Sequence, residues 1–451
     1  MNQNTKTIRL KIKKLGINGE GIGYVNKTIL FVPGALPKEE VLVKVTTKKR
    51  NFMEGKLIKI LKPSPERIQP KCPYYEQCGG CQLQHLTYEA QCHFKEDIIR
   101  QSLKKFQLSS LNIPIYPTIG MDNPWNYRNK LQFQVRQQKQ QIAVGLYKEN
   151  SHQLINISTC PVQEPLTMEI LRTVHQLIEQ YHLRPYDERH HDGFIKTVIV
   201  RIGQHTRQAQ VTLVTKKATF ANQKTFIRDL VAAHPEIKSI VQNINPHKTA
   251  IVMGEKEHVL WGERTIDETI ANKAFHLSSH AFLQLNPSQT EVLYNEALKA
   301  LDAKKDDIIV DAYCGIGTLG LSIADKVQHV YGMDIIPAAI EDAKYNAQTM
   351  NLHNVDYEVG TAEQWIPKWL NQQIKVDGLI VDPPRTGLDD TLVQTILKYR
   401  IPKLVYISCN PSTMARDLKA LASQYHVHYI QSVDMFPQTA RVEAVAKLTL
   451  K

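Results

Sequence analysis

The chain has 451 residues and is 42% hydrophobic, long enough for two or three domains with buried cores, which excludes a disordered protein. No apolar run approaches the roughly eighteen residues of a membrane helix, and the N-terminal residues lack the apolar core of a secretory signal. We therefore expect a cytoplasmic, monomeric protein that does not bind membranes. The formal net charge is +12, and residues 1–61, with thirteen Lys and Arg against four Glu, carry +9 of it. Such a basic module predicts a polyanionic partner, because lysines on phosphates release counterions; a solvated, solubilising face is the alternative.

Residues 1–61 contain short stretches in which apolar and polar positions alternate, at 8–12, 28–32, 41–45 and 55–60. Glycine-containing turns, such as 16–21, separate these stretches. Several short strands at close spacing are typical of a small barrel of the OB type. The basic residues lie largely on these strands and turns, as they do on an oligonucleotide-binding face.

Residues 62–276 begin with a proline-rich boundary and a cluster of cysteines. A helical pattern follows at 87–103, and strand patterns return at 131–136 and 197–202. This range therefore predicts an α+β unit. We expect the helical part near 85–115 to pack on the C-terminal unit.

The cysteines of this unit suggest a metal centre. Cys72, Cys78 and Cys81 have the spacing C-x5-C-x2-C, and Cys160 offers a fourth thiolate. The total of seven cysteines is odd, which argues against a disulfide framework. Four thiolates suit zinc or an iron–sulfur cluster equally well, and reduced thiols without metal are the third alternative.

From residue 277 onward, predicted strands and helices alternate. The predicted strands lie at 308–310, 329–333, 355–359, 378–381 and 404–407, with helical stretches such as 337–349 between them. This alternation predicts an α/β fold, a mostly parallel sheet with helices on both faces. In such a sheet, ligands bind at the carboxyl edge of the strands.

The first of these strands leads into a glycine-containing loop, D-A-Y-C-G-I-G-T at 311–318. Gly315 and Gly317 let the backbone approach a ligand closely, and Asp334 at the end of the next strand can accept both ribose hydroxyls of a nucleoside cofactor. The third glycine of a dinucleotide site is missing, so the loop favours S-adenosylmethionine. The alternative for the glycines alone is a tight structural turn.

Two later strands also end in reactive side chains. Asp382 precedes two prolines that make a rigid turn, which suits contact with cofactor or base; a helix cap is the alternative. Cys409 lies at a strand end just before a predicted helix, whose dipole is expected to lower the pKa of the thiol. A small buried hydrophobe is the alternative for Cys409. Glu443 opens the final strand as a candidate general base, although an ordinary exposed glutamate fits equally well.

Taken together and in this order, these motifs resemble the family of RNA 5-methyluridine methyltransferases over essentially the whole chain. The resemblance implies an N-terminal OB-fold (TRAM) β-barrel at 1–61, a central α+β domain at 62–276 and a Rossmann-like class I methyltransferase domain at 277–451. It also implies that Cys72, Cys78, Cys81 and Cys160 bind a [4Fe-4S] cluster, which spacing alone leaves open.

The same resemblance implies roles for single residues. Residues 282–286 resemble the F-x-Q-x-N segment of the family. The implied cofactor-binding residues are Gln284, Tyr313, Asp334 and Asp382, the implied nucleophile is Cys409 and the implied base is Glu443. The sequence departs from the family at three positions: Asp334 replaces a common glutamate, Gln438 a frequent histidine and Ala281 a frequent serine. Gln438 puts any imidazole at that position in doubt, and Cys92 and Cys314 have no expected role.

The implied reaction is S-adenosylmethionine-dependent methylation of uracil C5 in RNA through a covalent bond from Cys409 to C6. By resemblance, the TRAM barrel makes one or two uridines of 23S rRNA the expected target. Three alternatives remain: a tRNA uracil-C5 methyltransferase, an enzyme that methylates an exocyclic nitrogen of adenine or guanine, and a non-catalytic RNA-binding assembly factor. The motif D-P-P-R and the cysteine on the neighbouring strand disfavour the exocyclic nitrogen.

Overall fold

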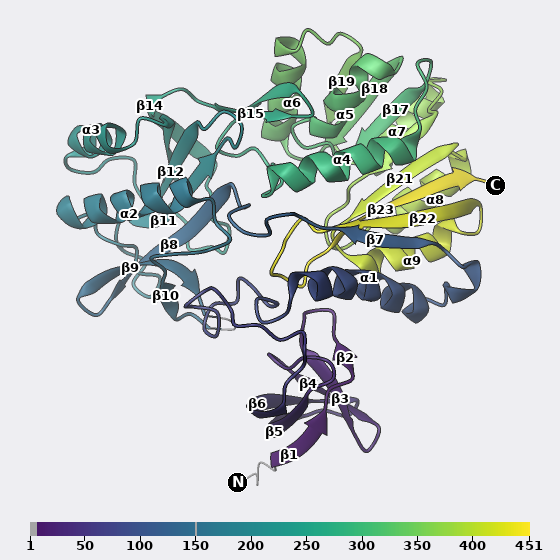
Figure 1. Cartoon of the computed structure of the whole chain (residues 1–451). Helices are drawn as coiled ribbons and strands as arrows, with labels where there is room; N and C mark the ends of the chain where they lie inside the picture. The colour runs from purple at the N-terminus through teal and green to yellow at the C-terminus, as the bar shows by residue number, and fades with distance from the viewer. Residues whose placement is uncertain (1–6, 149–150) are drawn as a thin grey trace.

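The computed structural model describes residues 7–148 and 151–451. These residues form sheets of six, seven, two and eight strands (Figure 1). Within the described residues, no helix is long and apolar enough to cross a membrane.

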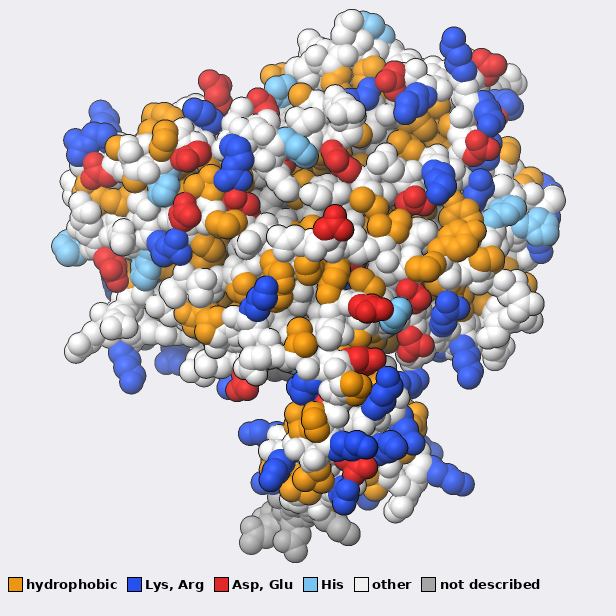
Figure 2. Space-filling view, viewed as in Figure 1, with side chains coloured by type: hydrophobic (Ala, Val, Ile, Leu, Met, Phe, Trp, Pro, Cys, Tyr) orange, Lys and Arg blue, Asp and Glu red, His pale blue; other side chains and the backbone are white. Residues whose placement is uncertain are grey.

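The six-stranded sheet forms the small N-terminal unit at the bottom of Figure 1. Leu30, Val32, Val41 and Val43 are fully buried in its core, whereas most of its lysines face outward. Lys and Arg side chains cover much of the visible surface of this unit (Figure 2). In spatial order its strands are β1 (Thr7–Lys11), β5 (Glu40–Lys48), β6 (Phe52–Lys62), β4 (Thr28–Val32), β3 (Gly21–Val25) and β2 (Lys14–Leu15).

The seven-stranded sheet is the core of the middle unit. Helices α2 (Pro165–Gln180) and α3 (Gln223–Ala233) pack on it, and β11 and β12 are buried along their whole length. Its strands in spatial order are β10 (Leu154–Asn156), β9 (Gln141–Tyr147), β8 (Lys130–Gln138), β11 (Ile195–Ile202), β12 (Ala209–Thr215), β13 (Ile237–Ile244) and β14 (Lys256–Gly262). A hairpin of β15 (Ile266–Ile270) and β16 (Lys273–Leu277) then leads to the C-terminal unit.

The eight-stranded sheet has helices on both faces, which confirms the expected class I methyltransferase architecture. Its strands in spatial order are β19 (Val355–Val359), β18 (His329–Asp334), β17 (Ile308–Ala312), β20 (Gly378–Val381), β21 (Lys403–Ser408), β23 (Glu443–Leu450), β22 (Tyr425–Val433) and β7 (Ile115–Ile119). Strands β17 to β21 are parallel, and β23 runs antiparallel to both of its neighbours.

Two hydrophobic cores fill the spaces between this sheet and its helices. One lies under α4 (Pro287–Leu301), α5 (Thr318–Ile323) and α6 (Pro337–Thr349). The other lies under α7 (Ala362–Asn371), α8 (Asp390–Tyr399), α9 (Pro411–Leu421) and α1 (Tyr88–Lys105).

Residues 88–119 belong spatially to the C-terminal unit although they precede the middle sheet in the sequence. Helix α1 packs against α9 and β7, and β7 pairs in parallel with β22 as the edge strand (Figure 1). Helix α1 thus packs on the C-terminal unit, as expected for the helical part near 85–115, and the range 62–276 is not contiguous in space. Local sequence patterns did not indicate that β7 would join the sheet of the C-terminal unit.

Candidate active site at the strand ends

The register of the eight-stranded sheet brings the predicted site residues to one edge. Val381 pairs with both Ala312 and Tyr406, so Tyr313 and Asp382 follow at the same edge as the end of β21. Ser408 pairs with Ala444 in the antiparallel ladder. Since β23 runs in the opposite direction, Glu443 at its start lies at the edge where β21 delivers Cys409.

The glycine loop is connected directly to the neighbouring strand end. The Gly315 amide donates to Oδ2 of Asp334 at 3.1 Å, and the Cys314 amide donates to the Met333 carbonyl at 3.0 Å. Gly317 has a φ of +80° and precedes the first turn of α5; a Cβ there would lie 2.8 Å from the Tyr357 hydroxyl. A Cβ on Gly315 would meet nothing within 4 Å. The loop at Gly315 is therefore open, and Asp334 lies beside it.

Tyr313 has a φ of +65°, which is uncommon for a residue other than glycine. Its ring packs half-buried on the core beneath α7 to α9. Burial raises the pKa of its hydroxyl, and the carboxylates of Glu363, Asp389 and Asp417 raise it further. The charged groups near Tyr313 are thus different from those near Cys409.

Buried carboxyl groups lie along this edge. Burial raises the pKa of Asp382 to about 6 and that of Asp311 to about 7, and the charges of Asp382 and Asp334 add to the shift of Asp311. The Gly320 amide donates to Asp311 at 2.8 Å. The cap of α8 is Asp389, which accepts from the Thr391 amide at 2.8 Å. This position of the cap removes the helix-cap alternative for Asp382.

Cys409 is half-buried, and its pKa is raised to about 11. Burial is the largest cause, followed by the negative charges of Glu443 and Asp382, while Arg385 acts in the opposite direction. The expectation of a lowered thiol pKa is therefore wrong. The N-terminus of α9 lies next to the thiol, but loss of water and two carboxylates outweigh it.

Glu443 is only 2% exposed, which excludes an ordinary solvent-exposed glutamate. Its Oε2 atom is buried without a hydrogen-bond partner among the described residues. Burial raises the pKa of Glu443 well above its usual value, Asp382 raises it further, and Arg385 lowers it. The three side chains Cys409, Asp382 and Glu443 therefore form one electrostatically coupled group.

Gln284 lies in the segment between β16 and α4 and is 8% exposed. The middle unit supports this segment, because Arg201 donates to the Ser278 carbonyl at 3.0 Å and the Asn129 amide donates to the Leu285 carbonyl at 2.9 Å. Asn286 caps α4 and also donates to the Met435 carbonyl at 3.1 Å. The segment of Gln284 thus contacts the loop that leads to Glu443.

Cys72, Cys78, Cys81 and Cys160 line one pocket, together with aromatic and aliphatic side chains. Burial raises the pKa of Cys81 to about 12, and its neighbours Cys160 and Cys78 contribute to the shift. The Gly80 amide donates to Sγ of Cys78 at 3.4 Å. Within residues 7–148 and 151–451, no group of three or more His, Cys, Asp or Glu is arranged to bind a metal ion. The thiols thus face a common pocket without forming a closed site for one ion.

Comparisons with known proteins agree with this geometry. The model of the tRNA (Uracil-5-)-methyltransferase family matches residues 87–451, and the TRAM domain model matches residues 2–58. The chain belongs to the RNA uracil-5-methyltransferase family. This assignment confirms the resemblance found in the sequence.

The relatives of this uracil-5-methyltransferase cover its whole length. Proteins of Enterococcus faecalis and Streptococcus pneumoniae, both described as uncharacterized RNA methyltransferases, are 52% and 51% identical over 445 residues, which is 98% of each chain. The crystal structure of Pyrococcus abyssi tRNA (uracil-54, C5)-methyltransferase in complex with S-adenosyl-L-homocysteine has a TM-score of 0.77 and 27% identity. That likeness covers 98% of this chain and 100% of the other.

The methyltransferase site contains two arginines that the sequence analysis missed. Arg385 opposes the rise in the pKa of Cys409, and burial and Arg385 lower the pKa of Arg441, while Cys409 acts in the opposite direction on Arg441. Both arginines are exposed. Arg385 ends the motif D-P-P-R that begins with Asp382, and Arg441 begins the motif R-V-E that ends with Glu443. Both arginines therefore lie close in sequence to residues that the sequence had already indicated.

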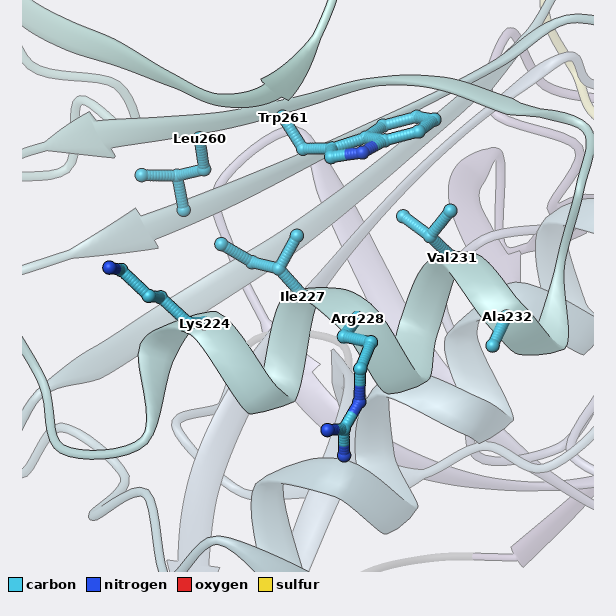
Figure 3. Close-up of a pocket in the computed structure, with 7 residues that line it drawn as sticks. All are labelled: Lys224, Ile227, Arg228, Val231, Ala232, Leu260 and Trp261. Atoms are coloured by element: carbon cyan, nitrogen blue, oxygen red, sulfur yellow. The ribbon is translucent and has the colours of Figure 1, made fainter.

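A separate pocket lies between α3 and β14, formed by residues far in sequence from these motifs (Figure 3). It is lined by Lys224, Ile227, Arg228, Val231, Ala232, Leu260 and Trp261. None of the predicted site residues lines it, so it is separate from the candidate active site.

Proposed function

We propose that this methyltransferase transfers a methyl group from S-adenosylmethionine to C5 of a uridine in RNA through a covalent bond to Cys409. The observation that carries the proposal is the coupled group of Cys409, Asp382 and Glu443 at one sheet edge. A thiol beside a buried carboxylate is the pair that this chemistry requires, because one adds to the ring and the other removes a proton.

Gln284, Tyr313, Asp334 and Asp382 are the proposed cofactor residues. In support, Gly315 leaves open space beside Asp334, whose Oδ1 and Oδ2 already accept from the Ile336 and Gly315 amides. Bound there, S-adenosylmethionine would supply the methyl group as an electrophile. The chain's own contribution is to place the uracil ring against it, since a misplacement of about 1 Å costs on the order of a hundredfold in rate.

Cys409 begins the reaction. Its pKa of about 11 keeps the thiol protonated at neutral pH, so its proton must pass to a base as Sγ bonds to C6 of uracil. We assign this base to Asp382, whose charge acts on the thiol and whose pKa of about 6 leaves it ionised at neutral pH; the proton returns to Sγ when the thiolate is released. Electron density then moves to C5, which becomes nucleophilic and accepts the methyl group. The tetrahedral C5 now carries both the methyl group and its original hydrogen.

Glu443 completes the proposed reaction. As carboxylate it accepts the C5 proton, the C5–C6 double bond re-forms, and the Sγ–C6 bond breaks to release the thiolate. Its raised pKa suits this role, because a carboxylate of higher pKa is a stronger base once ionised. Arg385 lowers that pKa and so supports the ionised state.

RNA containing 5-fluorouridine at the target position tests this function directly. Fluorine at C5 cannot leave as a proton, so the methylated adduct should accumulate as a covalent protein–RNA species on a denaturing gel. Cys409→Ala should form none, and Glu443→Gln should trap the adduct even with ordinary uridine. An adduct on the Cys409→Ala protein, or no methyl transfer from labelled cofactor by the unaltered protein, would contradict the proposal; the second result would favour a non-catalytic RNA-binding factor.

For the substrate we propose 23S rRNA, supported by the TRAM domain at residues 2–58 and the basic surface of that unit. tRNA is the second candidate, because the similar archaeal protein is a tRNA (uracil-54, C5)-methyltransferase. Mapping 5-methyluridine in both RNAs from cells lacking the protein separates the two. Loss from tRNA alone would contradict the ribosomal assignment.

We further propose that Cys72, Cys78, Cys81 and Cys160 bind a [4Fe-4S] cluster. The donor set fits, because all four sulfurs line one pocket of largely apolar walls and an amide already donates to one of them. Together the thiols would fix the loop at 72–84 onto the middle unit. Iron and acid-labile sulfide in anaerobically purified protein should each approach about four per chain, whereas zinc without sulfide would overturn the assignment.

A further inference from the structure

The 434–442 segment connects β22 to β23 and leads directly into Glu443. Other parts of the chain hold its backbone on several sides. The Asp434 amide donates to the Ile119 carbonyl at 2.9 Å, and the Tyr127 hydroxyl donates to the Pro437 carbonyl at 2.9 Å. Asp434 also forms a fully buried ion pair with Lys95 of α1. Residues far apart in sequence therefore determine the path of this segment.

Gln438, at the position where the family often has histidine, lies at the centre of these contacts. It is 2% exposed and has a φ of +70°. Its carbonyl accepts from the amides of Gln82 and Leu83 at 3.1 and 2.9 Å. A left-handed backbone at a residue other than glycine costs free energy and persists only where the surroundings enforce it.

Gln91 on α1 pairs with Gln438 through both amide atoms. The Gln438 backbone amide donates to Oε1 of Gln91 at 2.9 Å, and Nε2 of Gln91 donates to Oε1 of Gln438 at 3.0 Å. The same Nε2 lies within hydrogen-bond distance of the Leu83 and Leu86 carbonyls, at 3.1 and 2.9 Å. This amide pair is buried, and neither side chain titrates.

The amide pair joins the cysteine loop to the catalytic strand. Gln82 and Leu83 follow Cys81 directly, and Glu443 lies five residues after Gln438. Ala440 packs with Leu15 and Leu36 of the N-terminal unit and with Leu83. The barrel, the cysteine loop and the strand that begins with Glu443 thus meet at this one segment.

We infer that Gln438 and Gln91 are positioning residues that aim the Glu443 carboxylate at the C5 proton. This inference rests on the proposed function, in which Glu443 is the base. In this inference, Gln438 binds the segment through neutral hydrogen bonds and transfers no proton. A small rotation of the segment displaces the Glu443 side chain while leaving Cys409, which follows the end of β21, in place.

The test uses Gln438→Met and Gln91→Met. Each substitution keeps the length of the side chain and removes the hydrogen bonds made by its amide group. Gln242→Met is the matched control, because Gln242 is 1% exposed and, among the residues that the structure describes, its Nε2 donates within the middle unit alone, to Thr215 and Lys217 at 2.9 and 3.0 Å. Each full-length protein is mixed with labelled cofactor and ordinary uridine RNA. Methyl transfer in a single turnover, covalent adduct on a denaturing gel, and thermal unfolding are measured.

Both positioning variants should transfer the methyl group in the single turnover at nearly the normal rate, yet release the RNA roughly tenfold more slowly, because a displacement of a fraction of an ångström affects only the proton transfer. Methylated adduct should therefore accumulate. The control should show no adduct even if its melting temperature falls by the same amount.

Parallel loss of methyl transfer and release, or release at the normal rate, would overturn the inference. If Gln438→Met does not fold, Gln91→Met gives the same readout without altering the strained residue. Failure of the proposed function is distinguishable: in that case the unaltered protein makes no adduct with 5-fluorouridine RNA. If Glu443→Gln accumulates adduct but the glutamine variants do not, only this inference fails.

Discussion

Two regions of the molecule contain the thiols to which we assign roles, and their surroundings differ. At the sheet edge, Cys409 is a single half-buried thiol among charged side chains, with Asp382, Glu443 and Arg385 all influencing its pKa. In the middle unit, four thiols line one pocket with tyrosines and aliphatic side chains. In both regions burial is the largest cause of a raised thiol pKa.

The pKa alone therefore does not separate a proposed nucleophile from proposed ligands. The neighbours separate them. Cys409 faces a buried carboxylate whose Oε2 has no partner among the described residues, and such a group can accept a proton. The four pocket thiols have other thiols as neighbours, and once they are ionised a positively charged group between them would offset the repulsion of the thiolates.

The largest expected effect is the loss of methyl transfer in Cys409→Ala, by at least about a thousandfold, because removing a nucleophile removes the covalent route. Cys92→Ala is the matched control. Burial also raises the pKa of Cys92 to about 11, but that thiol lies on α1 beside the end of β7, which is three strands away from β21 in the sheet. Initial rates with labelled cofactor measure the effect. Equal losses in both variants would remove the distinction between the thiols.

The second largest effect is expected in the cysteine pocket of the middle unit. Cys81→Ala should lower the free energy of unfolding by about 3 kcal/mol or more, because it removes one proposed ligand of a group that ties the 72–84 loop to the middle unit. Cys92→Ala should cost about 1 kcal/mol. Urea titration followed by circular dichroism gives both values. Should the two variants unfold at the same urea concentration, the pocket thiols contribute no more than an ordinary buried cysteine.

The smallest effect is a shift in the pKa of Cys409 at the sheet edge. Alkylation of Cys409 by iodoacetamide requires the thiolate, so below a pKa of about 11 its rate should rise about tenfold per pH unit from pH 7 to 10. Glu443→Gln removes a charge that raises this pKa and should lower it, whereas Arg385→Gln should raise it further. Mass spectrometry of the Cys409 peptide follows the reaction. A rate that levels off by pH 8 would contradict the raised pKa.

The sequence was sufficient to predict which residues meet at the site wherever one rule of sheet geometry applies. Gly315, Asp334, Asp382 and Cys409 each follow a predicted parallel strand, and parallel strands end at one edge. The structure shows that alignment directly through the paired residues of β17, β18, β20 and β21. The mostly parallel sheet with helices on both faces followed from the same alternation of strands and helices, whereas the class I methyltransferase architecture came from the family resemblance.

The sequence was insufficient to predict contacts between residues that lie far apart in the chain. The pKa of Cys409 depends on Glu443, which only the antiparallel pairing of β21 with β23 places beside it. Gln438 looked like a departure from a motif, and its partner Gln91 lies 347 positions away. No local sequence pattern indicates that Glu443 lies beside Cys409 or that Gln91 contacts Gln438.

The pairing of β7 with β22 also constrains how the chain folds during synthesis. Ile115–Ile119 leave the ribosome long before Tyr425–Val433 are made. The edge of the sheet therefore cannot close until β22 has been translated, although the middle unit, encoded between these strands, can form first. Contacts of such long sequence separation slow folding. Until then α1 and β7 present an apolar helix face and an unpaired strand, which makes this protein a candidate client for chaperones that act on nascent chains.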